Sequence, residues 1–122
     1  MPSVPFTAID HVQLAMPEGM EDDARAFYSG LLGMTEIDKP AELKKRGGCW
    51  FSSGPVQIHL GIEPAFRPAR KAHPALRCHD YDELIARLKN AGIETKADQS
   101  IPRVERCHIF DPFGNRIELI RG

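Results

Sequence analysis

The sequence predicts an α+β fold in which a βαβββ module occurs twice in tandem, with each sheet packing one face on a helix and curling the other around a cavity. Both halves of the chain begin with a strand pattern, continue with an amphipathic helix and end in further strands. The closing strands of the two halves, residues 57–60 (QIHL) and 116–119 (RIEL), share one local pattern. The length of 122 residues suits a single domain.

In the first half, residues 9–14 alternate apolar and polar side chains, which is typical of a half-buried strand. Acidic residues 21–23 suit the start of a helix and Gly33 its end. Two short strands are predicted at 49–52 and 56–61, because turn residues separate them. The apolar stripe of the helix consists of Ala24, Phe27, Tyr28, Leu31 and Leu32.

In the second half, residues 73–78 predict a strand that Pro74 restricts to a strand start or a sheet edge. A second helix ends at Gly92, and strands at 104–110 and 115–121 flank the turn sequence DPFG. The helix is indicated by the apolar stripe of Tyr81, Leu84, Ile85 and Leu88. We therefore expect one domain with module 1 at about 6–63, a proline-rich linker at about 64–72 and module 2 at about 73–122.

Charge and cysteine content exclude several classes of partner. The 16 basic and 17 acidic residues give a formal net charge of −1, which provides no basic surface for nucleic acid. No apolar run approaches the roughly 20 residues of a membrane span, and the N-terminal residues lack a signal-peptide pattern. Three widely spaced cysteines without a CxxC motif do not suggest disulfides or a thiolate zinc site. We expect a cytoplasmic protein that binds neither nucleic acid nor a membrane.

Three stretches of the sequence resemble the vicinal oxygen chelate superfamily, the glyoxalase, bleomycin resistance and dioxygenase proteins. These stretches are residues 9–14 (IDHVQL), 26–33 (AFYSGLLG) and 110–119 (FDPFGNRIEL). The resemblance extends over nearly the whole chain and implies the glyoxalase-like fold of two modules. It says less about the reaction, because one fold can host several chemistries.

The resemblance also implies a metal site. In metal-dependent members of the superfamily, the first and last strands of each module each provide one ligand. These positions fall on His11 and His59 in the first half, and on His73 and Glu118 in the second. His59 departs from the pattern, because glyoxalase I typically has a glutamate there and the fosfomycin enzymes usually have no ligand. Three imidazoles and one carboxylate suit a divalent ion such as Zn, Ni, Co, Mn or Fe(II).

Two of the candidate residues are expected to be catalytic. Glu118 matches a ligand carboxylate that also moves the substrate's proton in glyoxalase-like isomerisation. His108 shares one face of its predicted strand with Arg106 and Phe110, and it matches a position that contacts the phosphonate in the fosfomycin enzymes. Histidine is the usual general acid or base near neutral pH, so His108 is a candidate for that role.

The resemblance implies a metal-dependent lyase, isomerase or thiol transferase that acts on a small oxygen-chelating substrate. A metal-free protein that sequesters a small molecule, as bleomycin-resistance proteins do, is the alternative. An iron(II) dioxygenase is less favoured, because the extradiol enzymes are normally longer. Small two-module chains of the superfamily commonly form homodimers with sites at module interfaces. The sequence leaves open whether the modules pair within one chain or between two.

Overall fold

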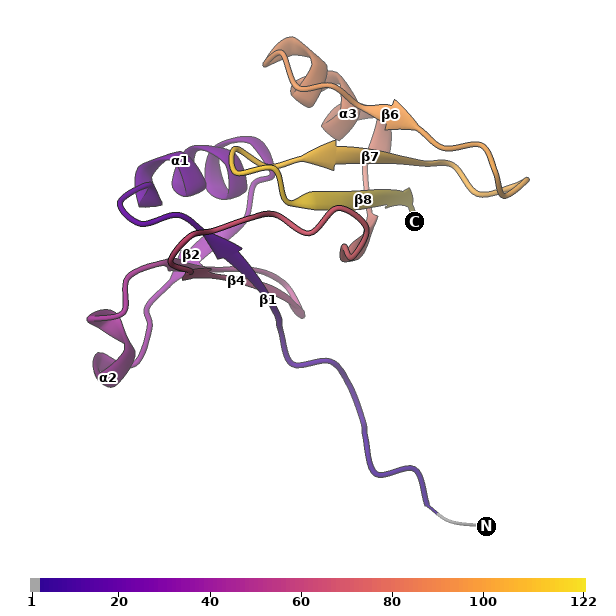
Figure 1. Cartoon of the computed structure of the whole chain (residues 1–122). Helices are drawn as coiled ribbons and strands as arrows, with labels where there is room; N and C mark the ends of the chain where they lie inside the picture. The colour runs from indigo at the N-terminus through magenta and orange to yellow at the C-terminus, as the bar shows by residue number, and fades with distance from the viewer. Residues whose placement is uncertain (1–2) are drawn as a thin grey trace.

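The computed structural model describes residues 3–122 and contains two four-stranded sheets with helical segments, as Figure 1 shows. The first half comprises β1 (Val12–Met16), α1 (Glu21–Arg25), the π-helical segment η1 (Ala26–Leu31), β2 (Thr35–Ile37), α2 (Ala41–Lys44), β3 (Cys49–Ser53) and β4 (Val56–Ile62). The second half comprises β5 (Ala75–Cys78), α3 (Tyr81–Asn90), β6 (Lys96–Ala97), β7 (Arg106–Phe110) and β8 (Arg116–Arg121). The predicted α+β fold of two tandem βαβββ modules is confirmed.

Each sheet places its first strand beside its last. The strand orders are β1-β4-β3-β2 and β5-β8-β7-β6, and the β1–β4 and β5–β8 pairs are parallel while the others are antiparallel. This order leaves β5 at the edge of the second sheet. Pro74 lies directly before β5, where its missing N–H disturbs no interior ladder, as the sequence predicted.

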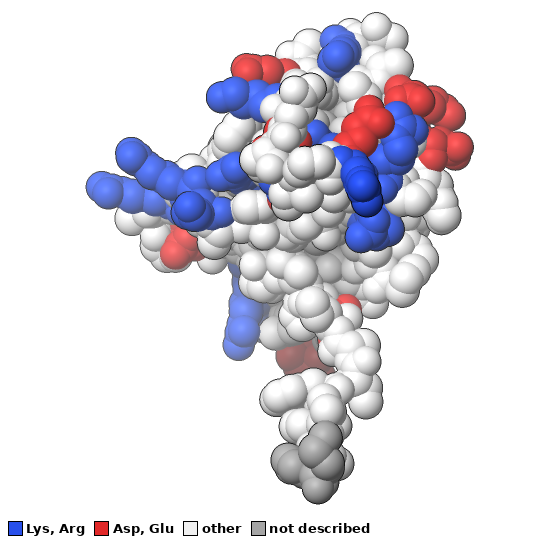
Figure 2. Space-filling model, turned by 90° about the vertical axis from the view of Figure 1, so that its right-hand side faces the viewer, with Lys and Arg blue, Asp and Glu red and all other residues white. Residues whose placement is uncertain are grey.

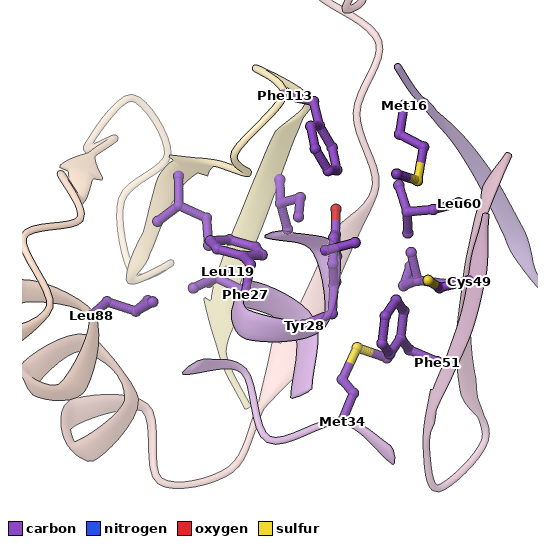
Figure 3. Packing of buried hydrophobic residues seen from close by; sticks show 14 of the residues in the cluster. Met16, Phe27, Tyr28, Met34, Cys49, Phe51, Leu60, Leu88, Phe113 and Leu119 are labelled. Carbon is purple, nitrogen blue, oxygen red and sulfur yellow. The ribbon is translucent and has the colours of Figure 1, made fainter. Parts of the chain in front are cut away.

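The hydrophobic core lies between the two sheets, with η1 in its centre. Figure 3 shows Phe27 and Tyr28 of η1 between β8, which carries Leu119, and β3, which carries Phe51. The rings of Tyr28 and Phe51 stack with 5.3 Å between their centroids. The largest fully buried side chains come from both modules and include Met16, Tyr28, Phe51, Ile58, Leu60, Leu88, Ile109, Ile117 and Leu119. The alternation of side chains therefore buries one face of each sheet and leaves the other face for the polar residues described below.

A buried polar network joins the modules inside this core. The hydroxyl of Tyr28 donates to Asp111 Oδ2 at 2.7 Å, and Asn115 Nδ2 donates to the same oxygen at 2.8 Å. Asn115 Nδ2 also lies 2.8 Å from the backbone oxygen of Ala15 in β1. Burial and the charge of Asp111 raise the pKa of Tyr28, which keeps its phenol protonated as a donor. The carboxylate thus has partners from both halves of the chain.

The structure differs from the sequence prediction at the shortest elements and at the first strand. Strands β2 and β6 and helix α2 lie in segments for which no element was predicted. The strand predicted from residue 9 begins at Val12, and the preceding residues form an arm that projects from the body of the molecule (Figure 1). The side chains of Val4, Phe6 and Ile9 on this arm are 82%, 84% and 79% exposed.

Charges of both signs share the face of the molecule that Figure 2 shows, whereas the projecting arm is mostly uncharged. Within residues 3–122, no helix is both long enough and apolar enough to cross a membrane.

The network predicts a measurable stability loss for Tyr28→Phe, which removes one hydrogen bond to a buried carboxylate and preserves the ring. We expect the free energy of unfolding in urea to fall by about 2 kcal/mol, since hydrogen bonds to charged groups contribute this much. Tyr81→Phe is the control, because its hydroxyl contacts the thiol of Cys107 instead of a carboxylate. Equal losses in the two variants would contradict a special role for Asp111.

Candidate metal centre

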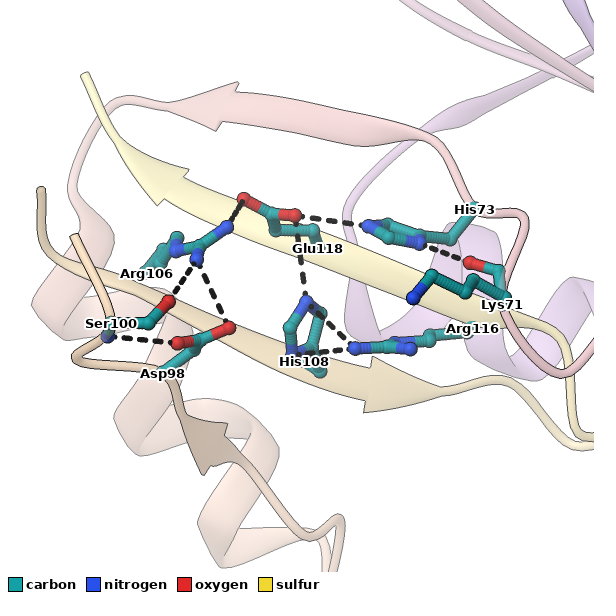
Figure 4. Close-up of polar contacts among 8 residues, drawn as sticks. All are labelled: Lys71, His73, Asp98, Ser100, Arg106, His108, Arg116 and Glu118. Atoms are coloured by element: carbon teal, nitrogen blue, oxygen red, sulfur yellow. Dashed lines mark hydrogen bonds and ion pairs between the residues drawn. The ribbon is translucent and has the colours of Figure 1, made fainter.

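The second sheet brings three candidate ligands to the face that lies away from the core. In the β7–β8 hairpin, His108 is directly opposite Glu118, so both side chains point to the same side of the sheet. His73 precedes β5, whose first residue, Ala75, is opposite Glu118 on the other side. Figure 4 shows the rings of His73 and His108 converging on the Glu118 carboxylate. We call His73, His108 and Glu118 the His/Glu cluster.

The distances in the His/Glu cluster match those of a potential metal site. The Nε2 atoms of His73 and His108 lie 3.0 and 3.4 Å from Glu118 Oε1. One ligand atom from each of the three residues lies within 4.8 Å of the other two. His108 and Glu118 are only 7% and 6% exposed, so these two residues are shielded from bulk water, whereas His73 is partly exposed. These residues could therefore hold a metal ion.

The second ring nitrogen of His73 supports this reading. Its Nδ1 lies 2.6 Å from the backbone oxygen of Lys71, which can only accept a hydrogen bond. Nδ1 therefore carries the proton, and Nε2 is the atom that faces the cluster. Histidines that bind metals usually donate their other ring N–H to such a carbonyl or carboxylate. Two imidazoles and a carboxylate are a donor set that borderline divalent ions accept.

Arg106 holds the second oxygen of Glu118. Its Nη1 donates to Glu118 Oε2 at 3.0 Å, while its Nη2 contacts Asp98 Oδ2 at 3.0 Å and Ser100 Oγ at 2.8 Å. Burial on its own raises the pKa of Glu118, but the contacts of its carboxylate with His73 and Arg106 outweigh this effect and keep the pKa below its usual value. The carboxylate is thus ionised, as a metal ligand must be.

The structure does not bring His11 and His59 to this cluster. They lie at the polar face of the first sheet, where their rings stack at 4.1 Å with 12° between their planes. The other face of His59 stacks on Trp50 at 3.9 Å, and its Nε2 lies 3.1 Å from Gln57 Oε1. Burial and the neighbouring His11 lower the pKa of His59. Among residues 3–122, the His/Glu cluster is the group of three or more side chains that could hold a metal.

Sequence reasoning assigned His108 to catalysis and overlooked that it joins the potential ligands. The predicted turn at residues 111–114 did not give this pairing, because a symmetric hairpin around it would set His108 opposite Ile117. In the structure Asp111 pairs with Asn115, so His108 and Glu118 each lie three residues from this pair and face each other. The contacts of Arg106 could not be predicted either, because they depend on the side-chain conformations of residues on β8 and after β6.

Two sheets of βαβββ topology, with histidines and a carboxylate gathered on one face, define a recognisable class of protein. The profile of the Glyoxalase/Bleomycin resistance protein/Dioxygenase superfamily matches residues 8–119, and the chain belongs to this superfamily.

Solved structures give the same fold. A glyoxalase family protein from Bacillus anthracis is 50% identical, covers 100% of this chain and 99% of its own, and superposes with a TM-score of 0.94. The fosfomycin resistance protein FosX from Listeria monocytogenes is 17% identical over 96% of this chain and 94% of its own, with a TM-score of 0.74. Lactoylglutathione lyase from Agrobacterium tumefaciens is 21% identical over 98% of this chain and 96% of its own, with a TM-score of 0.70. No functionally curated protein matches the sequence.

The contacts of Arg106 predict that Arg106→Gln raises the pKa of Glu118, because a hydrogen bond and a positive charge that lower it are lost. Carboxyl carbon NMR during an acid titration measures this change. The ion pair stabilises the fold above the ordinary pKa of glutamate, and this contribution disappears as the pH falls through the lower pKa of the folded state. In the variant, the protonation of Glu118 should therefore begin at a higher pH.

Arg121→Gln is the matched control, because Arg121 pairs with Glu105 and Asp82 instead of Glu118. The pKa of Glu118 should stay unchanged in this variant. An unchanged value in Arg106→Gln as well would contradict the assigned contact.

Proposed function

We propose that the chain is a metal-dependent enzyme that acts on a small substrate with neighbouring oxygen atoms, as a lyase, isomerase or thiol transferase. The observation that carries this proposal is the His/Glu cluster, whose three ligand atoms lie within 4.8 Å of one another. Superfamily membership supports it, since related chains of this fold include a lactoylglutathione lyase and a fosfomycin resistance protein by name.

In this proposal, His73 and Glu118 hold a divalent ion of zinc, nickel, cobalt, manganese or iron(II). Such an ion acts as a Lewis acid that polarises the oxygens of a substrate. The Lys71 carbonyl fixes the ring of His73, and Arg106 fixes one oxygen of Glu118 while the other faces the cluster. Both ligands are therefore oriented before a metal arrives, which reduces the entropy that binding must overcome.

The proton-transfer roles fall to Glu118 and His108. Their side chains are adjacent, with 3.4 Å between His108 Nε2 and Glu118 Oε1, so a proton released at one can be accepted by the other. Both are largely shielded from solvent, which limits exchange of that proton with bulk water. His108 either completes the metal shell or serves as general acid or base beside it.

His11 and His59 enter the proposal through a second copy of the chain. They lie on the first sheet and the cluster lies on the second, and both groups occupy faces turned away from the shared core. A homodimer that apposes the first sheet of one copy with the second sheet of the other would combine the two groups at each of two sites. The exposed apolar side chains of Val4, Phe6 and Ile9 provide surface for such an association. The predicted cytoplasmic location stays a prediction.

Metal content is the direct test. Protein purified without a metal-chelating tag should contain about one divalent ion per chain by elemental analysis, and His73→Ala and Glu118→Ala should lose it. His79→Ala is the control, because His79 is an exposed histidine of the same module outside the cluster. If the protein takes up none of the five metals, the metal-free sequestering function would replace the proposed one.

A complementation experiment tests the homodimer. One variant carries His11→Ala with His59→Ala, and the other carries His73→Ala with Glu118→Ala. If each site combines residues of two copies, neither variant alone binds metal, whereas co-expressed heterodimers regain one of their two sites. Full metal binding by the first variant on its own would show that His73, His108 and Glu118 suffice within one chain.

A further inference from the structure

The N-terminal arm, residues 3–11, presents apolar side chains that the rest of the molecule does not cover. The arm forms neither helix nor strand and projects from the body of the molecule (Figure 1). Val4, Phe6 and Ile9 are the three most exposed large apolar side chains within residues 3–122. No backbone hydrogen bond joins residues 3–9 to the rest of the described chain. Exposed apolar side chains that cluster in this way mark an interaction surface.

A mostly apolar groove of about 560 Å³ begins at the base of the arm. It lies between β1 and residues 63–74, which connect β4 to β5. Four consecutive residues of β1, 12–15, line it. Because successive side chains of a strand point to opposite faces, the groove runs along the outer edge of this edge strand. Its other apolar lining residues are Phe66, Ala69, Ala72 and Pro74. Cavities of this size hold whole small ligands, so several side chains can enter the groove.

The arm of the same chain leads away from this groove. Ile9 lines the groove, whereas the residues before it point outward from the body (Figure 1). At about 3.3 Å per residue, an extended segment carries Phe6 roughly 10 Å beyond Ile9. Residues 6–12 contain neither glycine nor proline, which would favour a tight reversal of the chain. The groove is therefore better placed to receive an arm that arrives from outside.

The charges of the arm and the groove favour such a contact. Asp10 is the single carboxylate of the arm, and it contacts the ring of its neighbour His11. The groove is bordered by Glu63, Arg67 and Arg116, which gives it a positive formal charge. The two arginines pair with no carboxylate within residues 3–122. An acidic arm base thus meets a groove whose margin is positive.

We infer that the arm of one copy of the chain docks into the groove of a second copy, with Phe6 as its anchor, and that the second arm docks in return. A two-fold axis makes this exchange reciprocal, because each copy offers both an arm and a groove. The inference rests on the homodimer of the proposed function and names the contact that holds it together. His73 also lines the groove, and His11 ends the arm. Arm exchange would therefore bring His11 of one copy towards His73 of the other.

Sedimentation velocity over a dilution series tests the role of the arm. The unaltered chain should form dimers, and Phe6→Ser should weaken them about a hundredfold, since each of the two arms loses a buried ring worth roughly tenfold. Ile101→Ser is the matched control, because Ile101 is an exposed apolar residue between β6 and β7. It should leave the dimer unchanged. A monomeric unaltered chain, an unaffected Phe6→Ser variant or equal weakening by Ile101→Ser would each overturn the inference.

A spin label on the arm identifies the groove that the arm occupies. Val4→Cys carries the label in a Cys78→Ser background, because Cys78 is the partly exposed native cysteine while Cys49 and Cys107 are buried. When spin-labelled chains are mixed with ¹⁵N-labelled chains, the amide signals of residues 69–72 should broaden. Broadening only where the spin label and ¹⁵N share one chain would mean that the arm folds back on its own groove, which would overturn the exchange. No broadening in either sample would overturn it as well.

Both measurements use metal-free protein and are therefore separate from the proposed chemistry. Arm exchange in a chain that takes up no divalent ion would leave this inference standing and reject the metal-dependent function. Metal uptake by a chain that shows no broadening between copies would overturn arm exchange and leave the metal site in place.

Discussion

The buried carboxylate of Asp111 is the constraint on which both the core and the candidate site depend. Its Oδ1 accepts the backbone N–H groups of Phe113 and Asn115 at 2.9 and 2.8 Å, which shapes the turn between β7 and β8. Its Oδ2 accepts hydrogen bonds from Tyr28 and Asn115. A buried charge is costly unless it is fully hydrogen-bonded, so these partners stabilise the fold. This turn sets the register of β7 and β8, in which His108 lies opposite Glu118. The geometry of the site therefore depends on the core.

Much of the fold could be predicted because the strands and helices carry clear periodicities. The apolar stripe through Phe27 and Tyr28 identified the first helical segment, and both side chains are in the core. Strands β2 and β6 were not predicted, because their three and two residues are too few to show an alternating pattern. Helix α2 was not predicted either, because its four residues are too few to show a helical period. The existence of β2 and β6 follows from their pairing with β3 and β7, which depends on tertiary structure.

The candidate site was only partly predictable. The resemblance to the superfamily implied that His73 and Glu118 belong to one site, and the structure places their side chains 3.0 Å apart. The stacking of His11, His59 and Trp50 was beyond the sequence, because it depends on how three rings from neighbouring strands orient. The assignment of His11 and His59 as ligands stays a prediction.

The parallel pairing of the first and last strands has a consequence for the order of folding. During synthesis, β1 has no partner in its own sheet until residues 56–62 have been made, and β5 has none until residues 116–121 follow. An unpaired strand edge invites association with other chains, so each half passes through a stage vulnerable to misassembly. Because the core lies between the two sheets, the first sheet gains its packing partner only when the second has formed. The half that carries His73, His108 and Glu118 therefore completes both its own sheet and the core of the whole domain.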